Sequence, residues 1–357
     1  MKVVVIAFSV KGAMGQYLYC WLKEMGKLIR LYLLCPSHYE FFEENYKLIK
    51  FKTSKKRLLA FFSYFNIFEF IKIKQSIEEI KPDLVHIFNG EGYPWAVLIS
   101  LWLKKNKIPY VITIHDVRPH YGDLWGIINN ILRYFSYKWA SGIHLHTKSA
   151  YGDVSFNTIA EKKVFIIPHG NIGSLFCKNK RRVIKSNIIM FFGRIEKYKG
   201  LDLFLKACLI LINEFKKDLI IVIAGPGKIG RREKKIIEKF EENKILLINK
   251  YLTYEEAGAL FSKAGVCVLP YKDASQTSLI GICGTFGVPV VATAVGGLKE
   301  DVPRIGGLLV NPNHPKELAI AILESLGRYS EYPKELEFSR LSIDFVKNYS
   351  DLIKGVI

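Results

Sequence analysis

An arginine and a lysine stand five residues apart, Arg194 and Lys199, in the stretch FFGRIEKYKGLD. The apolar run before them, 188–192, predicts a buried strand, Gly193 a turn, and 201–215, with apolar side chains about 3.6 residues apart, a helix. At the carboxyl ends of parallel strands, backbone N–H groups and helix dipoles favour anions, and two fixed cations add to that field. We therefore expect both side chains to hold a diphosphate. The alternative is a pair of solvated surface cations.

The composition is that of a large globular chain. Its 357 residues, 50% hydrophobic and 24% charged, are typical of two domains. The net charge of +19 is spread over both halves and favours anionic partners, namely nucleotide phosphates, polyprenyl phosphates, acidic lipid head groups or nucleic acid, without choosing among them. The six cysteines show no C-x-x-C spacing and no clustering with histidines, which indicates reduced thiols in a cytosol and no zinc site. The first ten residues are predicted to be a core strand and not a signal peptide.

Short β-branched runs alternate with longer helical patterns along the whole chain. This alternation is typical of parallel sheets with helices on both faces, and it occurs twice. The fold class is therefore predicted as α/β, with two doubly wound parallel sheets. The expected strands are 3–8, 28–34, 84–88, 110–114, 142–145 and 164–167 in the first half, and 188–192, 219–224, 245–248, 266–270, 290–292 and 307–310 in the second.

The stretch 177–187 is polar, basic and free of periodicity, which favours a linker between domains. We accordingly predict an N-terminal domain over 1–176 and a C-terminal domain over 188–335. A final helical segment, 336–357, is expected to pack back on the N-terminal domain.

Two stretches carry a resemblance to a known family. FGRIEKYKG resembles a G-R-x-x-x-x-K-G element, and GVPVVATAVGGLKEDV, 287–302, resembles G-x-P-V-V-A-T-x-x-G-G-x-x-E with Glu300 in the acidic place. Both elements are those of the retaining glycosyltransferases of family 4, which move a sugar from a nucleotide diphosphate to an acceptor. The resemblance implies the GT-B fold, two Rossmann-like domains facing a central cleft, with the acceptor domain first and the nucleotide-sugar domain second.

The resemblance also implies roles for individual residues. Arg194 and Lys199 would neutralise the departing diphosphate, and His115, in a stretch TIHDVRP that resembles the family's T-x-H-D element, would contact the sugar. These three are the predicted catalytic residues, although a lone histidine is more often structural. The expected acceptor contacts are Asp116 and Arg118. The expected donor contacts are Gly12, Gly15, Gly193, Gly225, Gly227, Lys250, Tyr251, Asp273, Gln276, Thr277, Ser278 and Glu300.

Three features leave alternatives open. Family members carry two glutamates eight positions apart, of which the second holds the ribose, and Ala274 and Ile282 stand there instead; Asp273 is the nearest substitute for the first. The loop 275–278 opens a helix, so its hydroxyls could serve only as helix caps. The glycines of the stretch GPGKIG, 225–230, match a dinucleotide fingerprint, but no acidic residue ends the next strand.

We expect a hexosyl transfer from a UDP-, GDP- or ADP-sugar to a glycan or polyprenyl-linked acceptor in cell-surface polysaccharide synthesis, with no cofactor. No obligatory metal is expected, because no D-x-D pair is present.

The basic, aromatic segment 52–74 and the segment 124–139 could each be an interfacial helix on an anionic membrane or a buried helix. The expected location is the cytoplasm, with peripheral contact at the inner face of the cell membrane. The competing hypotheses are a non-catalytic subunit with the same fold, then a nicotinamide-dependent oxidoreductase. Nucleic-acid binding is disfavoured because the positive charge is diffuse.

Overall fold

The computed structural model describes residues 1–54, 66–90, 93–115, 126–153, 163–176, 186–327 and 347–357. The chain forms two compact units, residues 1–170 together with 342–357, and residues 171–341. The division falls between Gly170 and Asn171, before the stretch 177–187, most of which lies outside the described residues.

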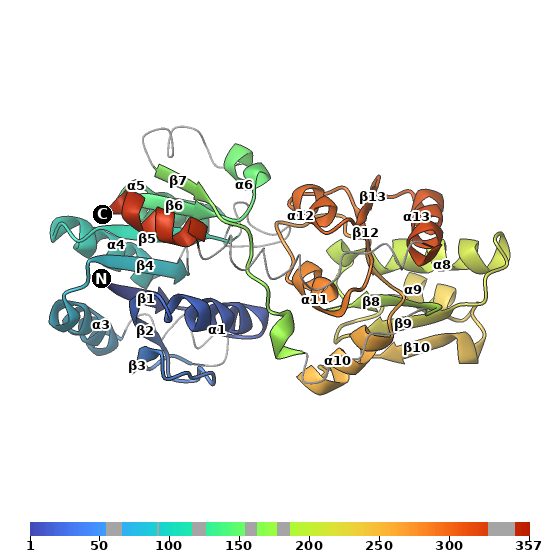
Figure 1. The fold of residues 1–357 in the computed structure, drawn as a ribbon, viewed down its shortest axis with the longest axis horizontal. Helices are drawn as coiled ribbons and strands as arrows, with labels where there is room; N and C mark the ends of the chain where they lie inside the picture. Colours follow the sequence, from blue (N-terminus) through green and yellow to red (C-terminus); the bar gives the residue numbers. More distant parts are fainter. Residues whose placement is uncertain (55–65, 91–92, 116–125, 154–162, 177–185, 328–346) are drawn as a thin grey trace. The chain divides into compact units, whose positions relative to one another are not determined.

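The first unit is built on a seven-stranded parallel sheet in the order β3-β2-β1-β4-β5-β6-β7 (Figure 1). The strands are β1 (Lys2–Ala7), β2 (Arg30–Pro36), β3 (Tyr46–Phe51), β4 (Leu84–Asn89), β5 (Tyr110–Ile114), β6 (Gly142–Leu145) and β7 (Lys163–Ile166). The helices are α1 (Ala13–Met25), α3 (Ile67–Ile80), α4 (Pro94–Lys105), α5 (Gly126–Lys138), α6 (Lys148–Asp153) and a C-terminal helix over 347–356.

Helices cover both faces of this sheet. Alternate strand residues such as Val4 and Ile6 point into one core, which α3, α4 and α5 complete with side chains such as Ile77, Ile99 and Tyr137. On the other face, Trp21 of α1 meets Tyr349 of the C-terminal helix, with ring centroids 4.7 Å apart. The C-terminal helix, drawn in red, therefore belongs to the first unit although the second unit precedes it in the chain (Figure 1).

The second unit holds a six-stranded parallel sheet in the order β10-β9-β8-β11-β12-β13. Its strands are β8 (Ile188–Phe192), β9 (Ile220–Ala224), β10 (Ile245–Ile248), β11 (Val266–Leu269), β12 (Val290–Thr293) and β13 (Leu308–Val310). Its helices are α8 (Leu201–Asn213), α9 (Arg231–Ile237), α10 (Tyr254–Lys263), α11 (Leu279–Phe286), α12 (Leu298–Arg304) and α13 (Pro315–Gly327), with 3-10 turns η1 (Gly173–Leu175), η2 (Lys197–Lys199) and η3 (Glu242–Lys244). Apolar side chains of α8 and α13 pack on one face of the sheet.

The predicted α/β class with two parallel sheets is confirmed, and every expected strand is present within two residues at each end. The strand β3 was not predicted. Its sequence, YKLIKF, has lysines at positions 47 and 50, and as an edge strand it keeps both lysines exposed, so it lacks the continuous apolar run of the buried strands.

Candidate functional site

The two predicted diphosphate ligands lie at the carboxyl end of β8 in contrasting surroundings. The Arg194 side chain is 60% exposed and its Nη1 lies 2.7 Å from Oε1 of Glu196. Lys199, at the end of η2, is only 9% exposed, and its Nζ donates a hydrogen bond of 2.9 Å to the hydroxyl of Tyr271. An ammonium is strongly hydrated in water, so burial beside a neutral phenol leaves it short of compensating charge.

Lys199 lies where β8, β11 and α11 meet. A Cβ on Gly193 would be 3.2 Å from the Lys199 Nζ and 4.0 Å from Leu279, the first residue of α11. Burial lowers the pKa of Lys199, and no acidic side chain among the described residues pairs with its ammonium. A cation is also disfavoured near the positive end of a helix. An anion placed here would relieve both costs, so the geometry suits a phosphate group.

Glycine residues let the loops after β8 and β9 approach each other closely. Gly225 has φ +137°, and a Cβ there would lie 2.2 Å from the carbonyl oxygen of Gly193. The Asn249 side chain then fixes the second glycine, because Gly227 N donates to its Oδ1 (2.9 Å) and its Nδ2 donates to the Gly227 carbonyl (3.0 Å). The glycines of the apparent dinucleotide fingerprint thus shape the same corner as Lys199.

The two loops named by the donor prediction also lie together. Gly296 has φ +42°, and a Cβ there would collide with the carbonyl oxygen of Ala274, to which Gly297 N donates at 3.3 Å. Glu300, half-buried in the first turn of α12, follows this contact. The stretch that ends in Glu300 therefore packs on the loop before α11.

Hydroxyl side chains lie at the start of α11, but they do not form a standard helix N-cap. Ser278 occupies the N-cap position without a side-chain capping hydrogen bond, whereas the Thr277 hydroxyl accepts a bond from Leu279 N (3.3 Å). Thr277 also hydrogen-bonds the Tyr271 hydroxyl, and this bond opposes the rise that burial produces in the pKa of Tyr271. Lys199, Tyr271 and the loop before α11 therefore form one connected site.

In the first unit, the turn after β1 and the end of β4 are tied together. The Oδ1 of Asn89 accepts from the backbone N–H groups of Phe8 and Ser9 at 2.8 and 2.9 Å. Gly12 is the N-cap of α1, and a Cβ on Gly15 would lie 2.3 Å from the Val10 carbonyl oxygen. The predicted glycine turn is thus held rigidly at the carboxyl edge of the sheet.

His115 follows β5 at the same edge and is 7% exposed. Its Nε2 lies 2.8 Å from the Phe88 carbonyl oxygen, and its Nδ1 lies 3.2 Å from Nε2 of His146, which follows β6. The predicted acceptor contacts Asp116 and Arg118 lie outside the described residues. The structure therefore places the predicted sugar-contacting histidine in a buried hydrogen-bonded pair.

Two family descriptions match this chain, one over each unit. "Glycosyltransferase Family 4" matches residues 14–170, and "Glycosyl transferases group 1" matches residues 186–328.

The chain belongs to the group 1, family 4 glycosyltransferases. An uncharacterized glycosyltransferase of Methanocaldococcus jannaschii is 24% identical over 300 residues, which cover 78% of each chain. A D-inositol 3-phosphate glycosyltransferase of Corynebacterium urealyticum is 28% identical over 159 residues, but the match spans 41% of this chain and 37% of that relative. The solved structure of Anabaena HepE in complex with UDP has a TM-score of 0.69 over 98% of this chain and 100% of that one, at 14% identity, and shows the shared GT-B fold.

The departure of this glycosyltransferase from the family's glutamate pair is visible in the structure. Ala274 and Ile282 are buried, 8% and 2% exposed, so neither position presents a polar group. Asp273 is exposed. At the end of β10, Lys250 pairs with Glu256 (2.7 Å) and Tyr251 is 78% exposed. These three predicted donor contacts, Lys250, Tyr251 and Asp273, lie on the surface of the second unit.

Two residues of the sites of this glycosyltransferase, Tyr271 and His146, were not predicted from the sequence. Tyr271 follows β11, and its place at the carboxyl end of a central strand was the available signal. His146 follows β6, whose Leu145 is in register with Ile114 of β5, so the residues after these strands had to be neighbours. A prediction of strand register would have paired His146 with His115.

Asn171 and His169, on either side of the turn at Gly170, have structural roles. Asn171 donates from Nδ2 to the Thr285 hydroxyl (3.0 Å) and accepts from Gly173 N (2.7 Å), which ties η1 to α11. His169 stacks on Tyr17 of α1, with ring centroids 3.7 Å apart. No helix in the described part of the chain is long and apolar enough to cross a membrane, and the same residues contain no group of three or more His, Cys, Asp or Glu that could hold a metal ion.

Proposed function

We propose that this glycosyltransferase moves a hexosyl group, with retention of anomeric configuration, from a nucleotide-diphosphate sugar to a glycan or lipid-linked acceptor in cell-surface polysaccharide synthesis. The observation that carries the donor assignment is the Lys199 ammonium, buried at the start of α11 and bonded to a neutral phenol. The reported UDP complex of Anabaena HepE supports a nucleoside diphosphate as the ligand of this fold.

The chemistry follows from where charge develops. As the bond from the anomeric carbon to the donor diphosphate breaks, negative charge grows on the departing phosphate, and a fixed cation in a water-poor site stabilises it more than bulk water does. Lys199 is already in place for this role. Arg194 is exposed and bonded to Glu196, so it must exchange that carboxylate for the diphosphate when the donor binds.

We expect these two cations to suffice without a divalent ion. Turnover with the preferred donor should be the same in excess EDTA as in magnesium, and a loss of most activity in EDTA that magnesium restores would refute this part of the proposal.

The transfer itself is tested with a panel of UDP-, GDP- and ADP-hexoses and membrane lipid extract or oligosaccharides as acceptors. The proposal predicts release of one nucleoside diphosphate that depends on acceptor, and a product whose anomeric proton in NMR spectra has the donor's configuration. A product of inverted configuration would overturn the assignment as retaining. Absence of transfer with every donor would contradict the proposed reaction.

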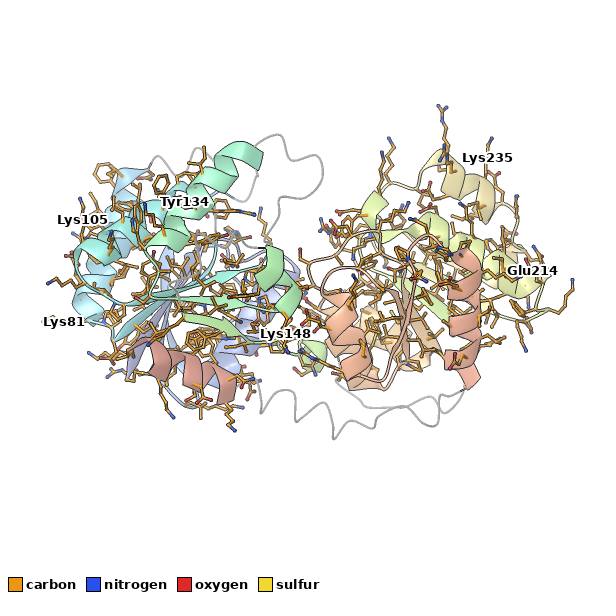
Figure 2. The ribbon with its side chains drawn as sticks, turned by 90° about the horizontal axis from the view of Figure 1, so that it is seen from above. Lys81, Lys105, Tyr134, Lys148, Glu214 and Lys235 are labelled. Atoms are coloured by element: carbon orange, nitrogen blue, oxygen red, sulfur yellow. The ribbon has the colours of Figure 1, made fainter. Side chains whose placement is uncertain are left out.

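We further propose that the first unit contacts an anionic membrane. Large apolar side chains are exposed on α3, with Phe68 at 80% and Ile67 at 55%, and on α5, with Ile131 at 53% and Tyr134 at 41%. Lys138 lies over the Tyr134 ring at 5.6 Å, and Figure 2 shows Tyr134 on α5 at the outer surface of the first unit. Aromatic groups flanked by cations are typical of helices that lie in a lipid interface. The part of 52–74 before residue 66 lies largely outside the described residues.

Cosedimentation with vesicles of anionic phospholipid at low salt tests this contact. Phe68→Glu should reduce binding strongly, whereas Ile320→Glu, a matched change at a 48% exposed position on α13 of the second unit, should not. Equal binding of both variants, or no binding of the wild type, would refute the proposed surface.

A further inference from the structure

The loop that follows β11 is in direct backbone contact with the turn η2. Gly200, directly after η2, has φ +69°, and a Cβ there would lie 1.9 Å from the carbonyl oxygen of Pro270, so the contact requires glycine. Two positions after Pro270, the backbone N–H of Lys272 donates to the carbonyl oxygen of Tyr198 at 2.6 Å. Both neighbours of Tyr271 in the chain are therefore fastened to η2.

A partly exposed ion pair joins the same two segments. The Nζ of Lys272 lies 2.8 Å from Oδ1 of Asp202, and the two side chains are 40% and 29% exposed. Asp202 is in the first turn of α8, where a carboxylate also interacts favourably with the positive end of the helix. Because α8 begins directly after Gly200, the pair lies beside the segment that carries Lys199.

The loop after β11 has a separate anchor in the sheet. The hydroxyl of Thr293, a completely buried residue of β12, donates to the carbonyl oxygen of Tyr271. Loss of the Lys272 charge leaves this bond in place. We therefore expect that opening the ion pair moves η2, with Lys199, and not the loop that carries Tyr271.

We propose that Lys272 is a positioning residue, which acts through its ion pair with Asp202 to hold η2 closed and the ammonium of Lys199 in place. A partly exposed ion pair contributes little to the free energy of unfolding, whereas displacement of a catalytic group by about 1 Å can lower a rate about a hundredfold. The pair should therefore affect the position of Lys199 far more than the stability of the unit. The role of the ammonium toward a diphosphate rests on the proposed function, but the closed state of η2 does not.

Acylation of lysine side chains in the full chain measures this closure without any nucleotide or acceptor. Lys199 is only 9% exposed, so sulfosuccinimidyl acetate should label it slowly in the wild type, at a rate followed by peptide mass spectrometry. Lys272→Met and Asp202→Asn each remove one charge of the pair, and each should raise the labelling rate of Lys199 several-fold. Labelling at the wild-type rate in both variants would overturn the proposal, even if transfer activity is demonstrated.

An ion pair at the opposite edge of the same sheet provides the control. Lys244 pairs with Asp218, and these residues precede β10 and β9 at the amino ends of the strands. Lys244→Met should leave Lys199 labelling at the wild-type rate, and so should Lys272→Arg, which keeps the cation. The double variant Asp202→Asn with Lys272→Met should be labelled no faster than either single variant, and additive increases would contradict action through the pair.

Steady-state kinetics with the donor found above provides the second readout. Lys272→Met should lower kcat about tenfold, while the midpoint of urea unfolding, followed by circular dichroism, stays close to that of the wild type. A lower midpoint with unchanged kcat would show that the pair is merely structural. Failure of the proposed function would appear as no transfer by any variant while the labelling differences persist.

Discussion

The buried polar side chains of the two units differ in how completely the protein satisfies them. In the first unit, the ring nitrogens of His86, His144 and His146 all lie within hydrogen-bonding distance of other protein groups, and the chain of contacts extends through Thr113 to Tyr349 of the C-terminal helix. In the second unit, the buried ammonium of Lys199 donates to the neutral hydroxyl of Tyr271 and lies over the rings of Tyr198 and Tyr271, and no carboxylate of the described residues pairs with it. The first arrangement fixes the position of a side chain. The second leaves charge to be completed by a ligand, which is the property expected of a donor site.

The comparison predicts that acid destabilises the first unit. Burial lowers the pKa values of His144 and His169 from 6.5 to about 3, so the unfolded chain binds more protons and stability falls as the pH decreases from 6.5 toward 3. At pH 5 each shift costs roughly 2 kcal/mol of unfolding free energy, or about 4 kcal/mol for the pair. All five tryptophans lie within residues 1–170, so tryptophan fluorescence during urea unfolding reports on this unit. Equal midpoints at pH 7.5 and pH 5 would contradict the account.

Substitution of the buried cation tests the other half of the comparison. Lys199→Ala should lower kcat by about 10² to 10³, the usual effect of removing one preorganised group from a developing charge. Because an uncompensated buried charge is costly, the free energy of unfolding should stay equal or rise. The exposed Lys197, in the same turn η2, provides the control, and Lys197→Ala should retain nearly full activity. A Lys199→Ala enzyme that loses stability and keeps its activity would assign the lysine a structural role.

Substitution of Arg194 should lower activity less than substitution of Lys199, because the Arg194 side chain is exposed and already paired with Glu196. We expect Arg194→Ala to lower kcat/KM about tenfold, and Arg194→Lys to recover part of this loss. Glu196→Gln removes the competing carboxylate and should leave kcat/KM unchanged or raise it slightly. A strong loss in Glu196→Gln would show that the ion pair itself is needed, and steady-state kinetics on the three variants distinguishes these outcomes.

The smallest expected effect concerns the hydroxyl of Tyr271. Tyr271→Phe removes the acceptor of the Lys199 bond and should lower kcat/KM a few-fold, with about 1 kcal/mol lost in unfolding free energy. In Tyr198→Phe, the ring that lies 5.9 Å from the same ammonium is kept, and kcat/KM should stay near the wild-type value. Similar losses in both variants would mean that the hydrogen bond to Tyr271 has no special role.

The site of the second unit was easier to predict from the sequence than the histidine network of the first unit. Arg194 and Lys199 are local to one strand-turn-helix segment, so their motif and the apolar run before it were readable together. The strands were predictable because their apolar residues form continuous runs, and β3 was not because lysines interrupt it. The histidine network depends on non-local contacts: His115 and His146 are 31 positions apart, and Tyr349 is 263 positions from His86. Such contacts follow from strand order and register, which propensity alone does not determine.

The central claim is that the second unit binds a nucleoside diphosphate through the buried ammonium. Calorimetric titration of UDP, GDP and ADP into the wild type, Lys199→Ala and Lys197→Ala tests it most directly. We predict that one diphosphate binds to the wild type and to Lys197→Ala with similar Kd, and at least tenfold more weakly to Lys199→Ala. Equal binding to all three proteins, or no binding of any diphosphate to the wild type, would contradict the account.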